Sequence, residues 1–158
     1  MSTLIRPATA TDAELIHRFV CELALYEKEP AAVETTPERI RSQLSSETPP
    51  FECLIAERGG SPAGMALFFQ NYSTWRGKPG LYLEDLFVPE QHRRHGVGQA
   101  LLSELARICL RRGYGRMEWA VLSWNQLGID FYEALGATRL PEWNLFRLTG
   151  DALSKLGS

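Results

Sequence analysis

Several features that define other protein classes are scarce or missing from this chain of 158 residues. Its three cysteines, Cys21, Cys53 and Cys109, are odd in number and far apart, which argues against a disulfide framework or a CxxC metal site. The longest apolar run, residues 65–69, is far too short to cross a bilayer. Basic and acidic residues number 17 and 19, and this balance gives no support for nucleic-acid binding or a polybasic membrane anchor.

Signatures of several enzyme and cofactor classes are also absent. The chain has no GK[ST] sequence for a Walker A loop and no GxSxG sequence for a hydrolase nucleophile. His92 and His95 are three residues apart, but the arginines beside them would repel a cation, so no metal site is expected. The first residues, 1–7, lack the apolar core of a signal peptide, and we therefore expect a cytoplasmic protein.

The length and the apolar content of 44% fit one globular domain over residues 1–158. A helix is expected to start at Thr11, with Thr11 and Glu14 as a capping box, and a shorter one at Thr36-Pro37. Because strands and helices are mixed along the chain, we predict a central mixed sheet with helices on its faces. The remaining expected helices are 99–112 and 127–135, and the expected strands are 4–6, 51–58, 63–72, 81–88, 116–122 and 144–148.

The most informative stretch is residues 93–100, Arg-Arg-His-Gly-Val-Gly-Gln-Ala, between a strand end and an amphipathic helix. Gly96 and Gly98 allow a sharp turn and a close approach to a ligand. The first helical turn then directs unpaired N–H groups and the positive end of the dipole at one spot, which suits phosphate. Arg93 and Arg94 add positive charge beside it. A plain strand-to-helix turn with solvated arginines is the alternative interpretation.

A dinucleotide fold fits this loop poorly. The GxGxxG fingerprint requires glycine at position 101, which is leucine here. Glu118 follows Gly98 by 20 residues and mimics the acid that binds ribose, but the fingerprint should follow its strand directly, whereas residues 89–95 intervene.

The sequence Arg93-x-x-Gly96-x-Gly98 resembles the acyl-CoA pyrophosphate loop of the GCN5-related N-acetyltransferases (GNAT). Four other pieces resemble the diamine (spermidine/spermine) N-acetyltransferase branch: residues 5–9, residues 82–88, Trp124-Asn125 with Phe131-Tyr132, and residues 143–146. Together they cover nearly the whole chain in the right order. The resemblance implies a GNAT fold with a mixed, mostly antiparallel central sheet flanked by helices, acetyl-CoA as co-substrate, and a homodimer.

The resemblance also implies which residues contact acetyl-CoA. Main-chain groups of Phe87 and Val88 would pair with the acyl carbonyl and the pantetheine amides, because the family's sheet splays after this strand. Asn125 would contact the pantetheine arm. The full set is Leu86, Phe87, Val88, Arg93, Arg94, His95, Gly96, Val97, Gly98, Gln99, Ala100, Asn125 and Tyr132.

Acetyl transfer to an amine needs a base, because a free alkylamine with a pKa of about 10.4 is protonated at neutral pH. Glu84 and Asp85 lie in an otherwise apolar strand, where successive residues face opposite ways and therefore do different jobs. A structural ion pair is the alternative for either, since an unpaired buried carboxylate is costly. The resemblance implies that Glu84 is a base acting through water and a ligand for a cationic substrate, with Asp85 structural or supporting.

Tyr132 is the candidate acid, because a phenol can protonate a departing thiolate. Ordinary packing is the alternative for a helical tyrosine, and its place in the family motif favours catalysis. The resemblance further places Tyr26, Glu27, Glu84, Glu142 and Trp143 at the amine substrate, where carboxylates and aromatic faces suit an alkylammonium. A solvated helix end and a core tryptophan are the alternatives there. Residues 26–32 are less acidic than in the branch, so selection of a multiply charged polyamine is weaker and a smaller amine is an alternative substrate.

We therefore expect an acetyl-CoA-dependent N-acetyltransferase that acts on a primary amine of a polyamine, diamine or thialysine-like amino acid by direct attack in a ternary complex. Cys109 lies on the apolar face of its helix and is a poor nucleophile. One alternative is an acetyltransferase of protein lysines or N-termini, which would need a peptide groove and ignore free diamines. The other is a non-catalytic acyl-CoA-binding module, which would release no thiol with any amine.

Overall fold

The computed structural model describes all 158 residues of the chain. They form two compact units, residues 1–120 and residues 121–158, so that a single domain over the whole chain stays a prediction. The first unit contains a five-stranded sheet in the order β1-β2-β3-β4-β5. Its strands are β1 (Thr3–Pro7), β2 (Glu52–Arg58), β3 (Ser61–Ser73), β4 (Lys78–Phe87) and β5 (Met117–Glu118). All neighbours are antiparallel except β4 and β5, which confirms a mixed, mostly antiparallel sheet.

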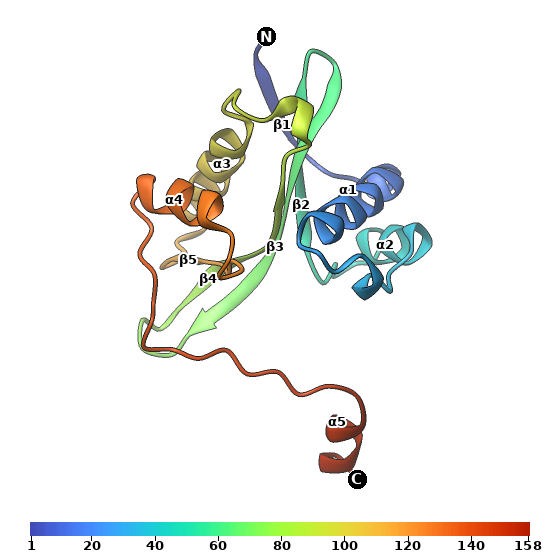
Figure 1. The fold of residues 1–158 in the computed structure, drawn as a ribbon, viewed down its shortest axis with the longest axis vertical. Coiled ribbons are helices and arrows are strands. Elements are labelled where there is room, and N and C mark those ends of the chain that lie inside the picture. Colours follow the sequence, from blue (N-terminus) through green and yellow to red (C-terminus); the bar gives the residue numbers. More distant parts are fainter. The chain divides into compact units, whose positions relative to one another are not determined.

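Helices cover both faces of this sheet, with α1 and α2 on one face and α3 on the other (Figure 1). They are α1 (Ala13–Tyr26), α2 (Pro37–Leu44) and α3 (Val97–Arg112). Short 3-10 turns precede each of them: η1 (Ala10–Asp12), η2 (Pro30–Ala32) and η3 (Glu90–His92). The apolar run in β2 follows from this arrangement, because its residues 53–56 are buried on both faces. Cys53 and Ile55 belong to the core cluster with Ile16 and Phe19 of α1.

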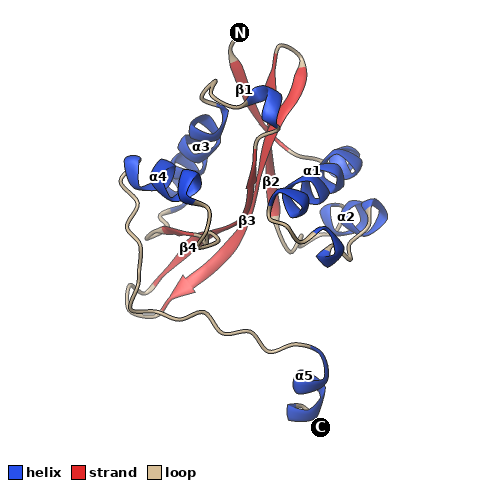
Figure 2. Cartoon of the chain, in the orientation of Figure 1, coloured by secondary structure: helices blue, strands red, loops and turns tan.

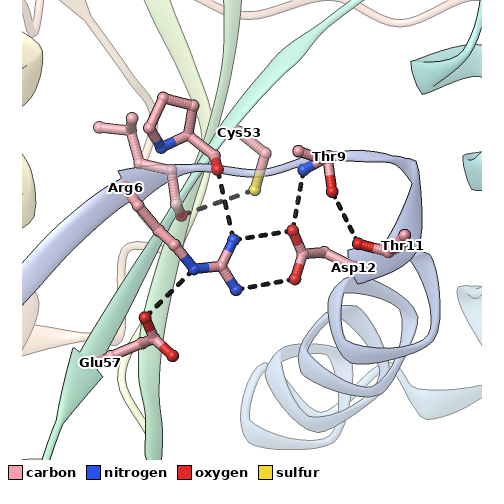
Figure 3. A network of polar contacts seen from close by, with 8 residues as sticks. Arg6, Thr9, Thr11, Asp12, Cys53 and Glu57 are labelled. Atoms are coloured by element: carbon pink, nitrogen blue, oxygen red, sulfur yellow. Dashed lines mark hydrogen bonds and ion pairs between the residues drawn. The ribbon is translucent and has the colours of Figure 1, made fainter. Parts of the chain in front are cut away.

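The start of α1 differs from the expected capping box of Thr11 and Glu14. The helix begins at Ala13 after η1, and the Thr9 N–H donates a hydrogen bond to the Asp12 carboxylate at 2.8 Å. That carboxylate is fixed in place because the Arg6 guanidinium donates two bonds to it, at 2.9 and 2.8 Å (Figure 3). Arg6 also donates from Nε to Glu57 at 3.2 Å, so one side chain ties β1 to β2 and to the start of α1.

The second helix start and the hairpin turn are confirmed, and α3 is confirmed with an earlier start. The Thr36 hydroxyl caps α2 by accepting a bond from the Arg39 N–H at 3.1 Å. Residues 59–60 turn the chain between β2 and β3. The α3 helix begins at Val97, two residues before the expected start, and ends at Gly113 with a left-handed φ of 71°. Its buried side chains are Val97, Leu101, Leu102, Leu105, Ile108 and Cys109.

Two predicted strands are wrong in whole or in part. The expected strand 116–122 is reduced to Met117–Glu118, because only these two residues find partners on β4. The expected strand 144–148 lies in a loop, residues 137–149, that contains neither helix nor strand (Figure 2). These residues pair with no strand of the sheet, and a strand without a ladder leaves its N–H and C=O groups unpaired.

The second unit contains α4 (Gln126–Ala134), as expected, and α5 (Gly150–Leu156), which the apolar pattern did not indicate. The sequence signal for α5 is charge, because Asp151 lies in its first turn and Lys155 in its last, where each complements the helix dipole. Ile129 is the one buried residue of this unit. Across the whole structure, no helix combines the length and the apolarity that a bilayer span requires.

Candidate active site

The pairing between β4 and β5 stops early and leaves part of β4 open. The two strands are joined only at Leu81–Met117 and Tyr82–Glu118. From Leu83 to Phe87, the edge of β4 that faces β5 has no strand beside it. Main-chain donors and acceptors on that edge have no strand partner. This opening agrees with the splayed sheet that the family resemblance implied, and it ends at the predicted acetyl-CoA contacts, residues 86–88.

The two acidic residues of β4 lie at a β-bulge. Leu67 of β3 pairs with Asp85 and its neighbour Phe68 with Leu83, so Glu84 has no residue opposite it. Glu84 is exposed, whereas Asp85 is half-buried. A bulge re-aims side chains and interrupts the strict alternation of faces. Glu84 and Asp85 therefore need not face opposite sides of the sheet, as regular pleating would require.

Glu84, Asp85 and Glu27 form one electrostatic cluster. Burial, followed by the charges of Glu84 and Glu27, raises the pKa of Asp85 from 3.8 to about 6. Burial, followed by the charge of Glu84, raises the pKa of Glu27. No arginine or lysine forms an ion pair with any of the three. The cluster therefore carries uncompensated negative charge, which favours an ammonium ligand.

The coupling of Asp85 to Glu84 and Glu27 could not be predicted from the sequence. Regular pleating predicted different jobs for Glu84 and Asp85, and the resemblance made Glu84 the base and Asp85 structural or supporting. The bulge has no sequence signature, since neither a glycine nor a proline marks it.

Two of the predicted amine-side residues, Tyr26 and Glu27, lie at the end of α1, in the same unit as Glu84. Tyr26 is the last residue of α1, and Glu27 follows it as the C-cap, with its N–H donating to the Leu23 carbonyl at 2.8 Å. The chain then reverses because Lys28 adopts a left-handed φ of 66°, and its N–H donates to the Leu25 carbonyl at 3.1 Å.

The predicted pyrophosphate loop contains two glycines with different roles. Gly96 is the N-cap of α3 and has a left-handed φ of 78°, a conformation that other residues rarely adopt. Gly98 lies inside the first helical turn and has no positive φ, so its backbone conformation does not require glycine. The small size of Gly98 is then best explained by a close approach to a ligand.

The main chain of this loop presents donors. The first hydrogen bond from the helix to its cap is donated by the Ala100 N–H to the Gly96 carbonyl at 2.9 Å. The N–H groups of Val97, Gly98 and Gln99 precede it and have no carbonyl within the helix to bind. Arg94 and His95 are exposed beside them. Oriented amides, the positive end of α3 and a cation thus coincide, an arrangement that binds phosphate.

The remaining predicted residues belong to the second unit. Asn125 is the N-cap of α4, and its Oδ1 accepts a bond from the Gly128 N–H at 3.0 Å, so it has a structural role beside the predicted pantetheine contact. Tyr132 is a half-buried residue of α4 with its ring 5.4 Å from that of Phe131. Glu142 and Trp143 are exposed in loop 137–149. No three His, Cys, Asp or Glu side chains are grouped as a metal site would require.

Comparisons with known proteins agree with this geometry. A model of the Acetyltransferase (GNAT) family matches residues 17–137. Thialysine N-epsilon-acetyltransferase from Bos taurus is 37% identical over 164 residues, which cover 97% of this chain and 96% of that protein. Spermidine/spermine N(1)-acetyltransferase-like protein 1 from Homo sapiens is 34% identical over 159 residues, covering 94% and 23%. A solved integron cassette protein from V. cholerae has a TM-score of 0.82 and 26% identity, covering 99% of this chain and 98% of that one.

Proposed function

The chain belongs to the GNAT family of acetyltransferases and is an N-acetyltransferase, and we propose that its acceptor is the primary amine of a small molecule such as a diamine or a thialysine-like amino acid. The observation that carries the proposal is the cluster of Glu27, Glu84 and Asp85, three carboxylates without a basic partner beside the open edge of β4. A cationic amine would relieve their mutual repulsion. The similarity to a thialysine N-epsilon-acetyltransferase supports an amino acid with a side-chain amine.

GNAT acetyltransferases use acetyl-CoA, which supplies an activated acetyl thioester when it is bound. The loop of residues 93–100 fits its pyrophosphate, because the amides of Gly98 and Gln99 and the exposed Arg94 side chain coincide there. Main-chain groups of Phe87 and Val88 would hold the pantetheine arm at the open edge of β4. Asn125 and Tyr132 are further contacts in this proposal.

Two side chains would move protons. Glu84 is exposed and can therefore accept the proton of the amine through a water molecule, which leaves the nitrogen free to attack the thioester carbon. Tyr132 would donate its phenolic proton to the sulfur that departs. Asp85 would hold negative charge behind Glu84 and favour the cationic amine on arrival. Tyr26, Glu142 and Trp143 would complete the amine site with aromatic faces and a carboxylate.

We further propose that the protein is a homodimer. The second unit supports this because one buried residue, Ile129, is too small a core for 38 residues, as divided at Val121–Ser158. Leu145 and Phe146 are 81% and 90% exposed, and a second copy would remove such apolar surface from water. Sedimentation equilibrium should give twice the chain mass of 17.8 kDa; a 17.8 kDa species at every concentration contradicts the dimer.

The decisive experiment for the function is release of the CoA thiol from acetyl-CoA across a panel of acceptors. The panel contains thialysine, ornithine, 1,3-diaminopropane, spermidine and a lysine-containing peptide. We expect turnover with the small amines and a Glu84→Gln variant that needs a higher pH for the same rate, because the amine must then lose its proton to solvent. Glu47→Gln, an exposed change on the loop after α2, is the matched control. Turnover with the peptide alone, or with no acceptor, contradicts the proposal.

A further inference from the structure

The side chain of Arg93 is engaged away from the amides of the pyrophosphate loop. Its Nε donates a hydrogen bond to the Val88 carbonyl at 2.8 Å, which ties the start of the loop to the residue that follows β4. Its guanidinium carbon lies 5.2 Å from the centre of the Tyr26 ring. Arg93 was predicted to be a positive charge for phosphate, and in the structure it also contacts the Val88 carbonyl and the Tyr26 ring.

These two partners come from opposite sides of the proposed reaction. Val88 lies at the open end of β4, where the pantetheine arm is proposed to bind. Tyr26 ends α1 beside Glu27, on the side proposed for the amine. A cation over an aromatic face is held by the ring quadrupole, and the flat guanidinium can stack while its Nε still donates to a carbonyl. Arg93 therefore connects the end of α1 to the end of β4.

The backbone next to Arg93 shows why such an anchor is needed. Arg94 has a left-handed φ of 65°, an unusual conformation for a residue other than glycine, and Gly96 repeats the left-handed geometry two residues later. A strained conformation persists only where its surroundings impose it. The contacts of Arg93 fix the residue immediately before this turn and so help to set the direction of the amides that follow.

We infer that Tyr26 and Arg93 are a positioning pair, in which the Tyr26 ring clamps the Arg93 guanidinium and thereby sets the affinity of the loop for the acyl-CoA pyrophosphate. This inference rests on the proposed function of the loop. It assigns a contribution to acetyl-CoA binding to Tyr26, a residue that lies on the amine side and that the sequence assigned to the amine alone.

A double-mutant cycle read by isothermal titration of coenzyme A tests the pair. Tyr26→Leu should weaken binding about two- to fivefold, the size expected for a partly exposed cation–π contact. Tyr26→Phe keeps the ring face and should bind as the wild type does. In an Arg93→Met background, Tyr26→Leu should cause no additional loss, because the cation is already gone. Tyr72→Leu, the same change at an exposed tyrosine of β3, is the matched control.

The coenzyme A affinities of the Tyr26 variants decide whether Tyr26 acts through its ring on Arg93. An unchanged affinity in Tyr26→Leu overturns the pair, as does a loss that persists in full in the Arg93→Met background. Equal losses in Tyr26→Phe and Tyr26→Leu would show that the hydroxyl acts instead of the ring, which also overturns it. Thermal unfolding of each variant separates a local effect from a general loss of structure. If wild-type protein binds no coenzyme A, the proposed function itself fails, and that outcome is distinct from a failure of the pair.

Discussion

Replacing Asp85 by asparagine should stabilise the folded protein at pH 8. Burial and the neighbouring charges of Glu84 and Glu27 raise the pKa of Asp85 from 3.8 to about 6, so the folded chain holds this proton more tightly than the unfolded chain does. The contribution of Asp85 to stability is then most favourable below its pKa of 3.8 in the unfolded chain, and it declines as the pH rises toward 6. Above that pH, the ionised carboxylate is a constant penalty that asparagine removes.

The size of the stabilisation follows from how far the pKa of Asp85 is raised. A rise from 3.8 to about 6 corresponds to at most about 3 kcal/mol at pH 8. Because Asp85 is only half-buried, solvent screening reduces this, and we expect a gain of roughly 1–3 kcal/mol. For a chain of this length, such a gain raises the melting temperature by roughly 3–10 °C. The gain should shrink as the pH is lowered from 6 toward 4.

Calorimetric or circular-dichroism melts at several pH values measure this difference. Glu84→Gln removes one of the charges that act on Asp85 and should give a smaller stabilisation with the same pH dependence. Glu47→Gln, at an exposed position, should change the melting temperature equally at all pH values. If Asp85→Asn destabilises the protein by the same amount at pH 4 and pH 8, the carboxylate is not under strain and the electrostatic reasoning is wrong.

Three further outcomes are expected from the structure. Tyr132→Phe should lower kcat by roughly 100-fold or more while the affinity for acetyl-CoA stays unchanged, and an unaltered kcat in steady-state kinetics removes Tyr132 as the acid. Gly98→Val should weaken coenzyme A binding by about tenfold in titration calorimetry with the melting temperature retained, and normal affinity would refute the loop assignment. Asp12→Asn should cost about 2–3 kcal/mol in urea unfolding, because Arg6 loses its two charged bonds. The Arg6 guanidinium lowers the pKa of Asp12, so this stability is lost as the pH falls, and an equal cost at low pH would contradict the pairing.

The loop and the helix that follows it could be predicted because their signals are local. A glycine at each end of α3 fixes its bounds, at Gly96 and Gly113, and both adopt the left-handed conformation that those positions need. The apolar spacing of Leu101 and Leu105 marks the buried face. Backbone sterics and helical periodicity act within a few residues, so the sequence contains all that is needed to predict them.

Strand pairing was predicted less well because it depends on distant partners. The pattern at residues 144–148 suits a strand, yet these residues pair with none, and the strand expected at 116–122 keeps only the two residues that pair with β4. Register has the same dependence, since the bulge that frees Glu84 arises from how β4 lies against β3.

The sequence by itself determined most helices and strands of the first unit and, through the resemblance, the family, and it predicted a phosphate-binding loop at residues 93–100. Only the tertiary structure decided that Asp85 joins Glu27 and Glu84 in one charged cluster, and that Arg93 bonds to Val88 and lies over Tyr26. The physical reason for this difference is how far apart in the sequence the interacting residues lie. Turn and helix preferences are settled between near neighbours in the chain, whereas burial, pKa shifts and cation–π contacts exist only after segments far apart in sequence have come together.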